Sequence, residues 1–164
     1  MIVLAAVLAA ACGGGSKLTL TVGSPSPGDV LNSSPFVVQG LASKVPEKAK
    51  VWLVVGGVED GQYFGVNSVD IDPGLRGDEG IAWQTQFYYS LCSPNFEPGK
   101  REVLLVEADL DLLNDLAQAL ANQEPVGREL VEDYVLASVT VDIQPNPAEC
   151  EEEQQTPPSQ PEEP

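Results

Sequence analysis

Short alternating apolar segments between turn residues restrict this chain to a mainly β fold. From Lys17 to Val22, Leu18, Leu20 and Val22 share one face and two threonines share the other. Later segments of similar character are bounded by turn-forming residues and cover 36–42, 49–55, 62–66, 81–89, 101–108 and 134–143. About seven short strands in a chain of this length predict a single β-sandwich.

One segment has helical periodicity instead. Residues 111–122 carry leucines at helical spacing, namely Leu112, Leu113, Leu116 and Leu120. Asp111 is placed to cap the N-terminus of this helix, and Pro125 lies beyond its end. We therefore expect one amphipathic helix inserted between the last two strands.

The direction of the Trp52 side chain depends on the register of its strand. If Val51, Leu53 and Val55 point inward, Trp52 and Val54 face outward, under the helix or in a binding patch. In the other register Trp52 is the core tryptophan often found on the third strand of such sandwiches. We favour the core position, because it is the more common fate of a tryptophan on a strand.

The chain opens with an unbroken apolar run from Ile2 to Ala11. As a helix this run would be about 15 Å long, too short to span a bilayer, and it is typical of a secretory signal. The residues Leu8-Ala9-Ala10-Ala11-Cys12 resemble the bacterial lipoprotein box. The resemblance implies cleavage before Cys12 and attachment there of acyl chains such as palmitate, which would anchor the protein stably to a membrane.

The chain therefore divides into four parts. Residues 1–11 are expected to be a signal peptide, and residues 12–16 a lipid-anchored flexible tether. Residues 17–144 are the sandwich domain. Residues 145–164 are rich in Pro, Glu and Gln and almost free of apolar side chains, so we expect them to be disordered. The expected location is extracytoplasmic, on the membrane of the cell envelope.

Once Cys12 is assigned to lipid, Cys92 and Cys150 are the remaining cysteines. An even pair in an oxidising compartment predicts a disulfide. Closing a loop of about 58 residues would stabilise the fold by roughly 4 kcal/mol in the chain-entropy model.

Composition argues against several functions. The chain has 25 acidic and 8 basic residues, so its formal charge is −17. This charge disfavours nucleic acid and anionic lipid headgroups as partners. The chain has no histidine, the most common general base and metal ligand. Glu107 and Asp109 are acids in an apolar context, and capping and solvation explain both. We expect no enzyme, no catalytic residue and no cofactor.

An acidic loop lies between two of the predicted strands. Residues 69–80 include four carboxylates, namely Asp70, Asp72, Asp78 and Glu79. Oxygen ligands of this kind could hold Ca²⁺, but their spacing lacks the regular calcium-loop pattern, so we expect no metal site. The loop also contains Arg76-Gly77-Asp78, a tripeptide that integrin ligands display and that arises easily by chance.

Two neighbouring segments resemble a known family. Ser24-Pro25-Ser26-Pro27-Gly28-Asp29-Val30 and Pro35-Phe36-Val37-Val38-Gln39-Gly40-Leu41-Ala42 are similar to the first two strands of bacterial immunoglobulin-like surface domains. The resemblance implies a non-catalytic module that binds a protein or a cell-envelope polymer, or acts as a spacer. The alternative is a Ca²⁺-dependent carbohydrate-binding protein that uses the acidic loop and nearby aromatic side chains.

Two tyrosines are the candidate binding face. Tyr63 follows a glycine-rich turn on a strand expected to be exposed, and Tyr88 lies opposite the inward face of its own segment. Exposed aromatic side chains are typical interface anchors. We predict that Tyr63 and Tyr88 share one solvent-facing surface, away from the tether.

The lipid anchor gives a direct test. Cys12→Ala should move the protein from the membrane fraction to the soluble fraction, because an acidic domain has no second means of attachment. Cell fractionation followed by immunoblotting measures this. A Cys12→Ala variant that still sediments with membranes would contradict the lipoprotein hypothesis.

Overall fold

The computed structural model describes residues 17–46, 50–148 and 150–151. The expected signal peptide, the tether with Cys12, and residues 152–164 lie outside this part of the chain. The strands are β1 (Leu20–Ser24), β2 (Val30–Leu31), β3 (Phe36–Ala42), β4 (Lys50–Gly57), β5 (Gln62–Val69), β6 (Arg76–Gly77), β7 (Gly80–Phe87), β8 (Gly99–Ala108), β9 (Val126–Gly127) and β10 (Val135–Ile143). The helices are α1 (Leu110–Asn122) and α2 (Arg128–Val131), with short 3₁₀ turns at Pro73–Leu75 and Glu132–Tyr134.

Two sheets pack face to face. The smaller sheet has the order β1-β3-β7-β6, and the larger has the order β2-β10-β8-β4-β5-β9. Neighbouring strands are antiparallel except β2, which pairs parallel to β10. The mainly β sandwich with an inserted helix, predicted from the sequence, is confirmed. The seven longer strands correspond to the seven predicted segments, whereas β2, β6 and β9 are short additions at sheet edges.

The first core lies between the two sheets. On β7 the side chains of Ile81, Trp83, Thr85 and Phe87 are buried and alternate with exposed ones, as the sequence predicts. The facing sheet contributes a buried set that includes Val51, Leu53, Val55, Val103, Leu105, Val139, Val141 and Ile143. This core closes the sandwich.

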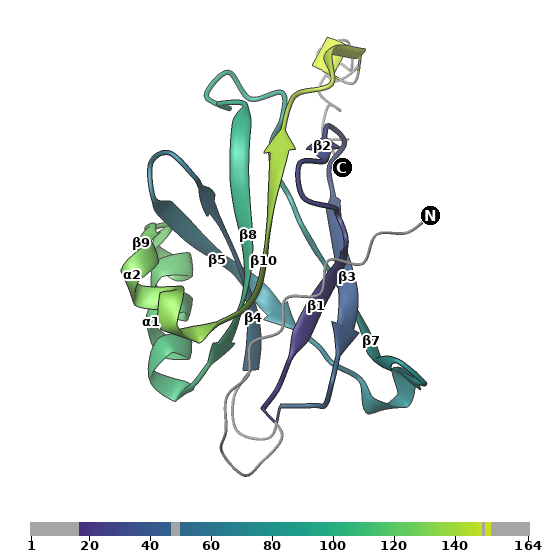
Figure 1. Cartoon of the computed structure of the whole chain (residues 1–164). Helices are drawn as coiled ribbons and strands as arrows, with labels where there is room; N and C mark the ends of the chain where they lie inside the picture. The colour runs from purple at the N-terminus through teal and green to yellow at the C-terminus, as the bar shows by residue number, and fades with distance from the viewer. Residues whose placement is uncertain (1–16, 47–49, 149, 152–164) are drawn as a thin grey trace, which may run out of the picture.

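A second core lies on the other face of the larger sheet. Four consecutive β8 residues, Val103 to Val106, are all 0% exposed, so this strand is covered from both sides. Leu104 and Val106 pack in a separate cluster with Leu112 and Leu116 of α1 and with Val131 of α2. Figure 1 shows the two helices on the outer side of the larger sheet. The domain therefore has three layers rather than two.

The favoured orientation of Trp52 is wrong. Val51, Leu53 and Val55 point into the core between the sheets, and Trp52 packs against the cluster under the helices. The observed register is the opposite of the expected one. It is stable because the helical layer partly buries a tryptophan on the outer face of the larger sheet. Trp83 of β7 is the tryptophan of the core between the sheets.

The N-cap of helix α1 lies two residues earlier than predicted. It is Asp109 rather than Asp111, and the Asp109 carboxylate accepts a hydrogen bond from the Leu112 N–H at 3.0 Å. Strand β8 ends at Ala108, so Asp109 is the first residue free to leave the strand. No helix in the described residues is long and apolar enough to cross a membrane.

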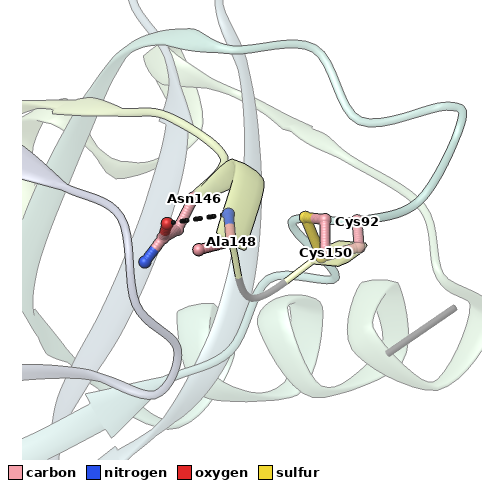
Figure 2. The surroundings of a disulfide bond; sticks show 4 residues. All are labelled: Cys92, Asn146, Ala148 and Cys150. Carbon is pink, nitrogen blue, oxygen red and sulfur yellow. Dashed lines mark hydrogen bonds between the residues drawn. A yellow bond between two sulfur atoms is a disulfide. The ribbon is translucent and has the colours of Figure 1, made fainter. Parts of the chain in front are cut away.

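The predicted disulfide between Cys92 and Cys150 is confirmed. It fixes the segment after β10 to the loop between β7 and β8, as Figure 2 shows. Asn146 stabilises a helical turn before Cys150, because its side chain accepts from the Ala148 N–H and its carbonyl accepts from the Cys150 N–H. The expectation of disorder from residue 145 onward is therefore wrong for 145–148 and 150–151.

Candidate functional site

Tyr63 and Tyr88 do not share a solvent-facing surface, which corrects the prediction. Tyr88 is 66% exposed, whereas Tyr63 is only 2% exposed and lies in the cluster beneath the helices. Alternation along β5 turns Tyr63 toward the outer face of the larger sheet. That face would be open to solvent in a two-layer sandwich, but here α1 and α2 cover it.

Phe64 takes the position expected of Tyr63. It points to the opposite face of β5 and is 43% exposed. Together with Tyr88 it lines a pocket of about 250 Å³. The other lining residues are Val55, Val66, Phe87 and Tyr89.

The pocket lies at the open edge of the sandwich. Beyond β5 the larger sheet has only β9, which pairs with Gln62 and Tyr63 alone. Beyond β7 the smaller sheet has only β6, which pairs at the start of β7. In the described residues, no further long strand therefore pairs with the remaining lengths of β5 and β7 at this edge of the sandwich.

Asn67 holds the two sheets together beside this pocket. Its side-chain amide donates to the Gln86 carbonyl at 3.1 Å, and its oxygen accepts from the Thr85 hydroxyl at 3.2 Å. The preceding residue, Val66, has no partner on β4, because Leu53 pairs with Asn67 and Val54 pairs with Gly65. Such a β-bulge re-aims side chains and is common next to binding sites.

The pocket is apolar with one polar rim contact. All six lining side chains are aromatic or aliphatic, and the Tyr88 hydroxyl accepts a hydrogen bond from the Gln86 side chain at 2.7 Å. Tyr89, one of the lining residues, packs edge-on against Phe87 and Phe96. Its burial raises the pKa of the Tyr89 hydroxyl, and the neighbouring Arg101 guanidinium opposes this rise.

The size of the pocket limits what it can hold. Sites for whole small molecules are typically larger than about 300 Å³. A pocket of about 250 Å³ fits one ring or side chain of a larger partner. The two exposed aromatic rings at its rim would supply most of the contact area.

The pocket is at the end of the domain opposite Lys17. Strand β1 pairs antiparallel with β3, and β3 pairs antiparallel with β7, so β1 and β7 run in the same direction. Ile81 is level with the start of β1 through Ala42, whereas Phe87 pairs with Phe36 at the far end. Lys17 and the pocket therefore lie at opposite ends of the domain.

A polar cluster fixes the helical layer to the sheet. The Tyr63 hydroxyl donates to the Glu102 carboxylate at 2.7 Å, and Arg128 donates to the Tyr63 hydroxyl at 3.1 Å. Arg128 also forms an ion pair with Glu102 and lies over the Tyr63 ring. Gly56 on β4 pairs with Tyr63 on β5. Glycine is required at position 56, because a Cβ atom there would lie 2.3 Å from the Tyr63 ring. The cluster joins β5, β8 and α2, so we assign it a structural role.

The acidic loop and the pocket are far apart. The loop joins the end of β5 to the start of β7, whereas the pocket is built from the start of β5 and the end of β7. Asp72 caps the 3₁₀ turn through the Gly74 N–H at 2.8 Å. The described residues contain no cluster of three or more acids or cysteines placed to hold a metal ion. Arg76 and Asp78 are exposed on the hairpin between β6 and β7.

Comparison with known proteins gives no family, since neither a family model nor a curated protein matches this chain.

The cluster around Tyr63 predicts a specific alkaline sensitivity. Burial and the Glu102 carboxylate raise the pKa of Tyr63, so folding keeps a proton that the unfolded chain releases near pH 10. Stability should therefore fall as the pH rises above about 10. Tyr63→Phe should lower the free energy of unfolding by about 1–3 kcal/mol at pH 7 and reduce this alkaline loss. Urea unfolding at several pH values measures both.

Tyr88→Phe is the matched control, because that side chain is largely exposed. It should leave stability at pH 7 within about 0.5 kcal/mol of the wild type. Equal effects of the two substitutions would contradict the role given to Tyr63.

Proposed function

We propose that this protein is an extracytoplasmic lipoprotein whose immunoglobulin-like domain is a non-catalytic binding module. Its contact site is the pocket around Phe64 and Tyr88. The anchor is the acylated Cys12, and the partner is a protein or a cell-envelope polymer that presents an apolar ring or side chain.

The observation that carries this proposal is the pocket itself. Two large aromatic side chains are exposed at its rim, and aromatic residues in a concave, apolar setting are typical anchors of protein interfaces. Asn67 and the buried Phe87 hold both bordering strands in place, so the pocket is preformed. A preformed site loses little conformational entropy on binding.

The disulfide supports the proposed location. The protein has a disulfide between Cys92 and Cys150. Disulfides persist in secreted and periplasmic proteins and are rare in reducing compartments. The position of Lys17 adds to this, because a tether reaching it from Cys12 would present the pocket outward.

The Ca²⁺-dependent alternative receives no such support. It requires the acidic loop to act together with nearby aromatic side chains. The loop and the pocket lie at opposite ends of β5 and β7, whose eight residues each span roughly 25 Å. We therefore favour binding through the pocket alone.

Site-specific photocrosslinking in cells tests the proposal. A photoreactive amino acid at Gln86, which is exposed beside Tyr88, should give intermolecular adducts of defined mass. The same amino acid at Thr140, which is exposed on β10, is the matched control. Tyr88→Ala should reduce the Gln86 adducts at least tenfold without changing the amount of protein. If Gln86 gives no more intermolecular adducts than Thr140, the domain is a spacer and the proposal fails.

A further inference from the structure

The chemistry of the pocket matches a particular class of peptide. Aromatic-lined grooves recognise proline-rich segments, because the polyproline II conformation is extended, needs little ordering, and places its rings against aromatic faces. The pocket offers exposed Phe64 and Tyr88 side chains, an apolar lining, and room for one ring. The Gln86 side chain beside Tyr88 adds a polar group at the rim.

The chain contains a segment of this class. Residues 156–161 read Thr-Pro-Pro-Ser-Gln-Pro and include two prolines with the P-x-x-P spacing, Pro158 and Pro161. Glutamates flank this segment on both sides, at 151–153 and at 162–163.

We propose that the proline-rich segment 156–161 docks in the pocket around Phe64 and Tyr88 of the same chain. This inference rests on the pocket being the binding site proposed above, and it names proline-rich segments as the ligand class. The segment would then occupy the site until an external partner displaces it.

The disulfide brings the segment within reach. The Cα atoms of Cys92 and Cys150 are 5.2 Å apart. Tyr88 precedes Cys92 by four peptide units, so their Cα atoms are separated by at most about 15 Å. Pro157 follows Cys150 by seven residues, which can span about 25 Å. The segment can therefore reach Tyr88 whatever path the intervening loop takes.

Tethering at such short range favours docking even when the contact is weak. A short linker gives its binding segment an effective concentration in the millimolar range. Without the disulfide, the chain would still be held at Ile143, where β10 pairs with β8, and the seven residues 144–150 would be added to the free tether. The Cys92–Cys150 bridge therefore shortens the tether and raises the effective concentration of the segment at the pocket.

The charges around the pocket fit the same occupant. Arg101, at the start of β8, lies close enough to oppose the raised pKa of Tyr89, and it acts more strongly there than the nearby Asp60. A cation beside Tyr89, one of the residues that line the pocket, suits a segment flanked by glutamates. Arg101 is one of only 8 basic residues in the chain, which has 25 acidic residues.

Proton NMR of the full chain tests the inference. Nuclear Overhauser contacts between the ring protons of Pro157, Pro158 or Pro161 and the ring protons of Tyr88 or Phe64 are expected. They should disappear when the three prolines are replaced, as Pro157→Ser, Pro158→Ser and Pro161→Ser together, and the Tyr88 signals should shift. Thermal melting confirms that the triple variant remains folded.

A peptide of residues 152–164 supplies the second arm. Added to the triple variant, it should restore the Tyr88 shifts with a millimolar dissociation constant, and it should fail to do so after a further Tyr88→Ala substitution. Absence of the proline contacts, with identical Tyr88 signals in both proteins, overturns the inference and leaves the crosslinking test at Gln86 unaffected. Proline contacts without any intermolecular adducts at Gln86 would instead contradict the proposed partner alone.

Discussion

The burial of strand β8 from both sides determines the rest of the structure. Most sandwiches cover each sheet on one face only, and their strands then alternate between buried and exposed side chains. The run from Val103 to Val106 has no exposed member, so it needs a second apolar layer on the outer face of the larger sheet. Leu112 and Leu116 of α1 and Val131 of α2 provide that layer.

This second layer explains which aromatic side chains are available for binding. It covers the outer face of β5 and buries Tyr63, whose hydroxyl is then satisfied by Glu102 and Arg128. The neighbouring Phe64 points to the other face, at an edge where the smaller sheet does not extend. The helices thus remove Tyr63 from the surface, while the exposure of Phe64 and Tyr88 at the proposed contact site depends on the sheet edge.

Much of the fold can be predicted from the sequence because alternation and turn residues act locally. The inward face of β7, the seven longer strands, the inserted helix and the Cys92–Cys150 bridge all follow from such patterns. Alternation shows that two residues lie on opposite faces, but it does not show which face another element will cover. The errors at Trp52 and Tyr63 share this cause, since both lie beneath the helical layer.

Other differences arise where two local signals compete. Asp109 and Asp111 can each cap a helix, and the end of β8 at Ala108 selects Asp109. Residues 145–148 and 150–151 have a composition typical of disorder, but the disulfide and the hydrogen bonds of Asn146 fix their conformation. The run Val103-Leu104-Leu105-Val106 was the available sign of a third layer, because four successive apolar residues do not fit a half-exposed strand.

The central claim is that α1 forms part of a second core, and a pair of leucines on this helix tests it most directly. Leu116 is fully buried against the larger sheet, whereas Leu120, one turn later, is 44% exposed. Urea unfolding should show that Leu116→Ala lowers the free energy of unfolding by about 2–5 kcal/mol. The same measurement should show a loss of less than about 1 kcal/mol for Leu120→Ala. Equal, small losses for both variants would mean that the helix merely rests on the sheet, and would contradict this account.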